Sequence, residues 1–521
     1  NASDTLALTL DSANAATFTG TVDVNGAEIT VGTNGSIFAE NNLRFKSSGT
    51  VYIDHNTTGQ SFIFRTSTSS SLDTTALTLT NAGNATFTGT VAGTSFNGIP
   101  FFTDTANASM YTHNVSATDS TAANNTAYGF TAMDAITSGD RNTALGWGSG
   151  GAILSATDNT LVGYAAGDAL TTGIRNVAIG ASALGAEDAH GYNVAVGYGA
   201  LQVQNAGANA YNVAVGYEAG VAITTGANNT IMGGIAGDAL TTGANNVAIG
   251  YAALSTEDAH GRNVAIGVQS LFALNAGADA YNVAIGFNSG GAMTTGVQNT
   301  VIGSFTGDAL LAGSYNQVFG YNALGAETGA SRSTAIGYFA LATQNVGSGE
   351  ANNIAIGHSA GAAVTSGVKN TLMGNLAGNA LTTGSENVAI GYLALSTEDA
   401  HGRNVAVGNN TLKTLNAGAN ALNVAVGYDA GLAMTTGTNN TIIGALAGDA
   451  LTTGSYNVAV GRNALSAEDA HGTNVAVGYD TLALQNAGAD AYNTAIGYAA
   501  GVAITTGQYN TVLGGEAGDS L

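Results

Sequence analysis

The sequence predicts an all-β fold, a parallel β-solenoid of coils of about 17 residues, from three observations. A pentad Asn-(Val/Thr)-Ala-(Ile/Val)-Gly, strict or relaxed, recurs 23 times from residue 125 onward. Successive pentads from Asn159 to Asn229 are spaced 17, 17, 19 and 17 residues apart, and this 70-residue super-repeat continues to Asn510. The chain of 521 residues holds 75 glycines and one proline, and only 9% of it is charged. Frequent glycine and few charged helix formers exclude a helical repeat.

Each pentad predicts one short strand followed by a turn. In the segment 176–180, alternation places Val177 and Ile179 on one face and Ala178 on the other. We expect stacked coils to form one core of Val, Ile and Leu rows, and the alanine face to pack closely between chains. Each Asn is expected to stack in an amide ladder. The Gly that follows allows a turn with positive φ.

Residues 1–124 lack the pentad repeat and predict a different organisation. A Leu-Thr-Leu…Ala-Thr-Phe-Thr-Gly-Thr-Val motif begins at Leu8 and returns at Leu77. We interpret 1–92 as a small N-terminal β domain, 93–124 as a connector that caps the first coil, and 125–521 as the repeat array. We expect the natural protein to continue beyond Leu521.

The charge balance excludes two classes of partner. The formal net charge is −23, from 34 acidic and 11 basic side chains. Such a chain is repelled by nucleic acid and by anionic membrane surfaces. The absence of cysteine excludes disulfides, cysteine metal sites and a catalytic cysteine. No apolar run is long enough for membrane insertion.

A recurring Glu-Asp-Ala-His loop holds four of the seven histidines. Its two carboxylates and imidazole are typical metal ligands. The alternative is a polar loop whose acidic residue caps a turn while His packs beside it, and a fifth copy at Glu327 has lost both Asp and His. We favour the cap, and predict no metal, cofactor or catalytic residue. The four loops are Glu187–His190, Glu257–His260, Glu398–His401 and Glu468–His471.

Two other columns of residues offer further candidates. Asp168, Asp238, Asp308, Asp449 and Asp519 recur in Gly-Asp-(Ala/Ser)-Leu, and we interpret them as local caps rather than calcium ligands. A tyrosine often follows the pentad Gly. These rings either stack on sugars or form a ladder at the corner of the coils, in which each ring covers the ring of the next coil, and we favour the ladder. These tyrosines are Tyr164, Tyr198, Tyr217, Tyr251, Tyr338, Tyr392, Tyr428, Tyr479 and Tyr498.

The Asn-Val-Ala-Ile-Gly repeats resemble the head domains of YadA-like trimeric autotransporter adhesins. The fuller pattern from Asn440 through Asn457, together with the N-terminal motif, is more similar to bacteriophage tail fibres. The resemblance implies a left-handed parallel β-roll and a homotrimer. It also implies a structural, non-enzymatic segment of a virion tail fibre that supports attachment to a host cell. Expected partners are other copies of the chain, tail or baseplate proteins and host-surface glycans. The alternative is the head of a bacterial surface adhesin.

Overall fold

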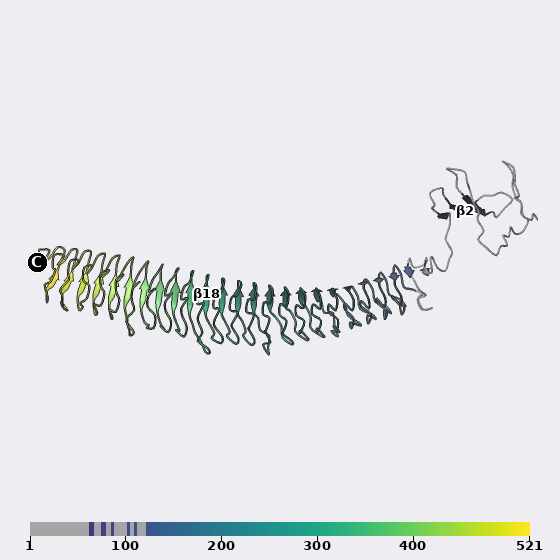
Figure 1. Ribbon diagram of the computed structural model, residues 1–521, viewed down its shortest axis with the longest axis horizontal. Helices are drawn as coiled ribbons and strands as arrows, with labels where there is room; N and C mark the ends of the chain where they lie inside the picture. The colour runs from purple at the N-terminus through teal and green to yellow at the C-terminus, as the bar shows by residue number, and fades with distance from the viewer. Residues whose placement is uncertain are drawn as a thin grey trace, which may run out of the picture. The chain divides into compact units, whose positions relative to one another are not determined.

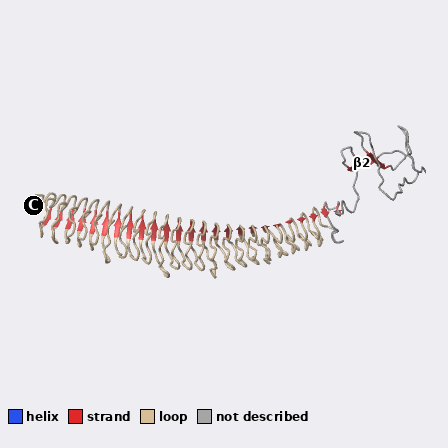
Figure 2. Cartoon of the chain, in the orientation of Figure 1, coloured by secondary structure: helices blue, strands red, loops and turns tan. Residues whose placement is uncertain are grey.

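The computed structural model describes residues 62–66, 74–79, 85–87, 102–104, 109–111 and 121–520. All regular elements in these ranges are β-strands, with no helix among them (Figure 2). The chain divides into two compact units, Asn1–Ala92 and Gly93–Leu521. The second unit is a long stack of similar coils (Figure 1).

In the first unit, three strands form an antiparallel sheet in the order β1-β2-β3. They are β1 (Phe62–Thr66), β2 (Thr74–Leu79) and β3 (Ala85–Phe87). Leu77 pairs with Phe87, so β2 and β3 are the two halves of the second Leu-Thr-Leu…Ala-Thr-Phe motif. The first copy of the motif lies outside the described residues, and the predicted N-terminal β domain therefore stays a prediction.

The second unit begins with β4 (Phe102–Asp104) and β5 (Ser109–Tyr111), an antiparallel pair whose second strand pairs in parallel with β6. From β6 to β28 each coil contributes one three-residue strand. The bounds are β6 Thr126–Tyr128, β7 Thr143–Leu145, β8 Thr160–Val162, β9 Val177–Ile179, β10 Val194–Val196, β11 Val213–Val215, β12 Thr230–Met232, β13 Val247–Ile249, β14 Val264–Ile266, β15 Val283–Ile285, β16 Thr300–Ile302, β17 Gln317–Phe319, β18 Thr334–Ile336, β19 Ile354–Ile356, β20 Thr371–Met373, β21 Val388–Ile390, β22 Val405–Val407, β23 Val424–Val426, β24 Thr441–Ile443, β25 Val458–Val460, β26 Val475–Val477, β27 Thr494–Ile496 and β28 Thr511–Leu513.

Each of these strands pairs in parallel with the strand one coil further on, at the same pentad position. Between β9 and β10, for example, Ala178 pairs with Ala195. The register is the same across the 19-residue step, where Ala195 pairs with Ala214. The extra residues therefore lie outside the strand, and the predicted parallel solenoid of about 17-residue coils is confirmed. The strands line up along the stack with the loops beside them (Figure 2).

The direction in which the strand residues face reverses our prediction. Ala178 is fully buried inside the coil, while Ile179 is 38% exposed and Val177 is partly exposed. The predicted core of Val and Ile rows, with alanine facing other chains, is therefore wrong. The reason is the preceding Asn176, which is also fully buried. Because residues two apart share a face of a strand, an inward Asn places the central Ala inward as well.

In several coils the strand and the return segment differ in size at facing positions of the interior: a small strand residue is accompanied by a large return residue, or the reverse. Where the strand centre is Ala178, the eighth residue after the coil's Asn is the buried Leu184. Where the strand centre is Leu161, that eighth position is Gly167, and a Cβ there would lie 2.8 Å from a methyl group of Leu161. Close packing of this kind tolerates little added volume.

The predicted asparagine ladder is present, and it joins side chains to backbone as well as coil to coil. Asn176 donates its backbone N–H to Oδ1 of Asn159 (2.8 Å), and Asn193 donates its own to Oδ1 of Asn176 (3.0 Å). The Asn176 amide also donates to the carbonyl of His190 (3.1 Å), at the far end of its coil. Asn176 thus satisfies buried backbone groups on two sides.

The glycine that ends each pentad has the predicted positive φ, and it is also required by space. Gly180 has φ +135°, and a Cβ there would collide with the carbonyl oxygen of Gly197 in the next coil. The same contact recurs one coil on, where Gly197 meets Gly216. The coils therefore approach through a column of glycine backbone that no other residue can supply.

The inward strand face leads to a first prediction, for β21. We expect Ala389→Leu to destabilise the roll by about 1–3 kcal/mol, because the side chain enters a filled core. Val388→Thr should change stability little, since Thr371 occupies that position in β20. Thermal unfolding followed by circular dichroism makes the comparison. If Ala389→Leu is tolerated and Val388→Thr is destabilising, Val and Ile face the core and Ala faces outward, as the sequence alone had predicted.

The asparagine ladder leads to a second prediction. Asn370→Ala removes the acceptor of the Asn387 N–H and the donor to the Gly384 carbonyl. Leaving two buried groups unpaired should cost roughly 2–6 kcal/mol. Asn416→Ala, at an exposed loop position, is the matched control and should be neutral. Equal unfolding temperatures for the two variants would show that the ladder contributes nothing.

Candidate functional site

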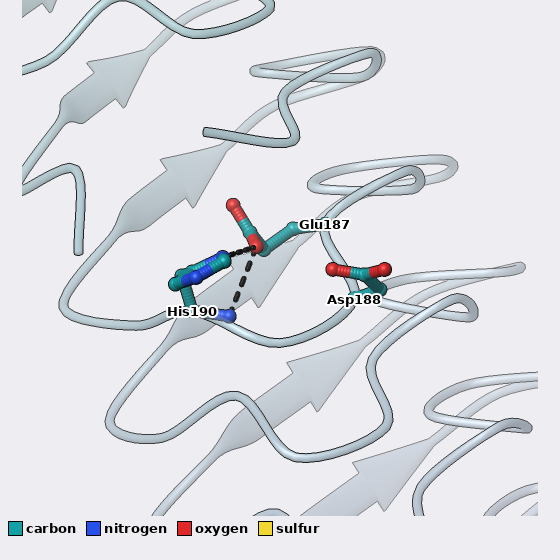
Figure 3. A group of neighbouring side chains, drawn as sticks. All are labelled: Glu187, Asp188 and His190. Carbon is teal, nitrogen blue, oxygen red and sulfur yellow. Dashed lines mark hydrogen bonds and ion pairs between the residues drawn. The ribbon is translucent and has the colours of Figure 1, made fainter. Parts of the chain in front are cut away.

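The four Glu-Asp-Ala-His loops begin at a core position. Glu187 is the eleventh residue after its coil's Asn, where other coils carry the buried Leu170, Ile223 and Leu240. All four glutamates of these loops are fully buried. A charged group thus interrupts an aliphatic column once in every four coils, and such a group requires compensation. Figure 3 shows one of these loops.

The buried carboxylate caps the turn that follows it. Oε1 of Glu187 accepts the backbone N–H of His190 (3.0 Å), and Oε2 accepts the amide of Gln204 (3.2 Å). In the second loop, Oε1 of Glu257 accepts the N–H of His260 (3.1 Å) and Oε2 that of Ala276 (3.3 Å). This is the cap that we favoured from the sequence.

The histidine ring lies against the same carboxylate. Nδ1 of His190 is 3.4 Å from Oε1 of Glu187, and the other three loops repeat this contact at 3.5–3.6 Å. In all four loops Nδ1 is buried and has no hydrogen-bond partner. Asp188 points away from the Glu–His pair (Figure 3), yet one ligand atom from each of the three side chains lies within 4.8 Å of the others.

The fifth loop shows what the carboxylate does without a histidine. Oε1 of Glu327 accepts the N–H groups of Gly329 (3.0 Å) and Ala330 (2.8 Å). Oε2 accepts the Gln344 amide and the Val346 N–H, both at 3.0 Å. Glu327 thus has four short hydrogen bonds, whereas each glutamate beside a histidine has two.

Three aspartates of the Gly-Asp motif, Asp238, Asp308 and Asp449, are partly buried, and desolvation raises the pKa of Asp168, Asp308 and Asp449 above the ordinary value. Hydrogen bonds from local backbone, such as those to Asp168, oppose this and support the predicted cap. Oδ1 of Asp308 and of Asp449 has no partner. In the remaining coil of this type the residue is Asn379, whose amide, suitably oriented, donates to the carbonyls of Leu376 and Ser396.

Several of the predicted tyrosines form ladders. Tyr198 stacks on Tyr217, and Tyr479 on Tyr498, each at 5.5 Å between ring centroids. These rings are exposed at their edges and covered by one another on the facing sides, as a corner ladder requires. Trp147 extends the same column by stacking on Tyr164.

A second ladder, formed by the residues that precede each Asn, was missed from the sequence. Tyr192 stacks on Tyr211 at 5.0 Å, and Arg175 donates to the Tyr192 hydroxyl (2.7 Å). Tyr492 stacks on Tyr509 in the same way. The recurrence of Arg and Tyr at this one position of the repeat was the available signal.

An exposed apolar stripe runs along the sheet, and it follows from the reversed strand orientation. The side chains that flank each central strand residue face outward, so that aliphatic groups gather on one surface from coil to coil. Stripes of this extent mark interaction surfaces. The most exposed members are Leu145, Ile179, Met232, Ile336, Ile354, Met373, Val424, Ile443, Ile496 and Leu513.

Comparison with known proteins adds no relative: no protein-family model, curated protein or solved structure matches the chain. Within the part of the chain that the structure describes, no helix has the length and apolar character needed to cross a membrane.

The half-buried aspartates lead to a third prediction. A raised pKa means that the folded state holds the Asp449 proton more tightly, so its contribution to stability is lost as pH rises through the folded-state pKa. Asp449→Asn should therefore raise the unfolding temperature at pH 7 and leave it unchanged below about pH 3. Thermal melts across this range test the sign. A variant that is less stable at pH 7 would contradict it.

Proposed function

We propose that the chain is a structural segment of a bacteriophage tail fibre, a homotrimeric left-handed β-roll that holds a host-binding tip away from the particle. The observation that carries the proposal is the unbroken register of the parallel strands from β5 to β28. A continuous stack of this kind is an extended spacer, because each coil contacts only its neighbours. The same chemistry recurs coil after coil, which suits a structural role better than an enzymatic one.

The apolar stripe supports self-association as the way in which the fibre is built. It follows the strands of the whole roll, and a second copy of the chain carries the same stripe at the same spacing. Parallel copies in register would bury these columns together, as closed symmetry requires. The Val/Ile face thus replaces the alanine face as the proposed contact between chains.

The alternative is the head of a trimeric bacterial adhesin, which the same roll and stripe would serve. The remaining partners differ with the assignment: tail or baseplate proteins for a fibre, the cell envelope for an adhesin. In both cases host-surface glycans are proposed contacts, reached through the exposed edges of the aromatic ladders.

A fourth prediction concerns the assembly. Light scattering should give three times the chain mass of 51.3 kDa. Ile336→Asp with Ile443→Asp should shift the mass toward one chain, because charges would enter the buried stripe. Asn416→Asp, at an exposed loop position, is the control and should stay trimeric. A monomeric unaltered chain would contradict the trimer.

Immunogold electron microscopy separates fibre from adhesin. Antibodies raised against residues 125–521 should label projections on phage particles and leave uninfected cells unlabelled. Labelling confined to cell surfaces would contradict the fibre and support the adhesin. Labelling of neither particles nor cells would contradict both proposed functions.

A further inference from the structure

We propose that each of the four Glu-Asp-Ala-His loops binds one divalent transition-metal ion, with Zn²⁺ the ion that best fits its donors. The ligands are Nδ1 of the histidine, Oε1 of the buried glutamate and a carboxylate oxygen of the aspartate. This inference is independent of the proposed fibre function, and it departs from the sequence-based prediction of no metal in these loops. It starts from an imbalance of charge inside the coil.

The glutamates beside histidine lack the hydrogen bonds that a buried carboxylate requires. Glu398 receives only the N–H groups of His401 (3.2 Å) and Ala417 (3.4 Å), and both contacts are long. Glu327 receives four shorter ones. The described residues place no Lys or Arg within ion-pair distance of these four glutamates. A positive charge at the histidine side of the carboxylate would supply the missing compensation.

The imidazole Nδ1, which has no hydrogen bond, is the atom at which a metal ion would bind beside the carboxylate. Nδ1 of each histidine lies 3.4–3.6 Å from the glutamate Oε1 without a hydrogen bond. Two ligands of one tetrahedral Zn²⁺, each about 2.0–2.1 Å from the metal, are roughly 3.3 Å apart. The Glu–His spacing thus needs little adjustment to hold an ion.

The aspartate distinguishes a metal from a simple Glu–His ion pair. An ion pair needs only histidine, and the loop at Glu327, with Thr328 for Asp, Gly329 for Ala and Ala330 for His, lacks both groups. Glutamate alone remains there, and extra backbone donors satisfy it. Asp188 is partly exposed, so its carboxylate is free to turn toward the pair while water completes the coordination.

The test counts zinc on the full chain, freed of any tag and stripped with chelator. Isothermal titration with ZnCl₂ and elemental analysis after dialysis should give four ions per chain. His401→Ala should give three, and replacement of all four loop histidines by Ala should give none. The fifth loop shows that the fold accommodates Ala at this position. Circular dichroism checks that each variant is folded.

A gain-of-site variant provides the matched control. Thr328→Asp, Gly329→Ala and Ala330→His together rebuild the loop sequence beside Glu327 and should raise the count to five. Zinc absent from the unaltered chain, or a count unchanged by the histidine substitutions, overturns the proposal. It is also overturned if the histidine variants lose stability only at acidic pH with zinc absent throughout, because the histidine is then a protonated partner of glutamate.

Discussion

The structure depends on one constraint, which is that the backbone of every coil must hydrogen-bond to the next coil at the same position. The strand of each coil is only three residues long, and its ladder alone is too short to fix that position. The buried asparagine supplies what is missing. Asn229 accepts the N–H of Asn246 in the next coil and donates to the Gly243 carbonyl of its own coil. In this coil it therefore fixes both the stacking and the closure.

The inward asparagine determines what the rest of the strand can be. Since Asn and the central residue share a face, the centre must fit inside a narrow coil, and alanine is the usual solution. The β-branched neighbours suit an extended backbone but point outward. The exposed apolar stripe is thus a consequence of the hydrogen-bonded ladder. Burial of that stripe between chains would explain why a chain with so few charges carries so much apolar surface.

The sequence was sufficient for the period, the amide ladder and the glycine column, because each depends on a residue type that recurs in strict register. It misled us about the strand faces, because we ranked Val and Ile above Ala as core residues and overlooked the asparagine two positions before. Asn176 and Ala178 held that information in their spacing. The core position of Glu187 was also readable, since the equivalent residue in other coils is aliphatic, as in Leu170 and Ile223. The unpartnered Nδ1 of His190 required coordinates.

The glutamate in the core column is explained by the irregular coil that follows it. Gly226 lies fourteen residues after Asn212 and is followed by a coil of 17 residues, and its N–H donates to the Thr241 carbonyl of that coil (3.2 Å). After Glu187 the next coil has 19 residues, and the equivalent N–H of His190 turns to the carboxylate. After Glu327 the next coil has 20, and the carboxylate accepts four donors. The buried carboxylate thus accepts backbone N–H groups that a longer next coil would leave without a partner. The solenoid can therefore carry a longer loop every fourth coil without loss of register.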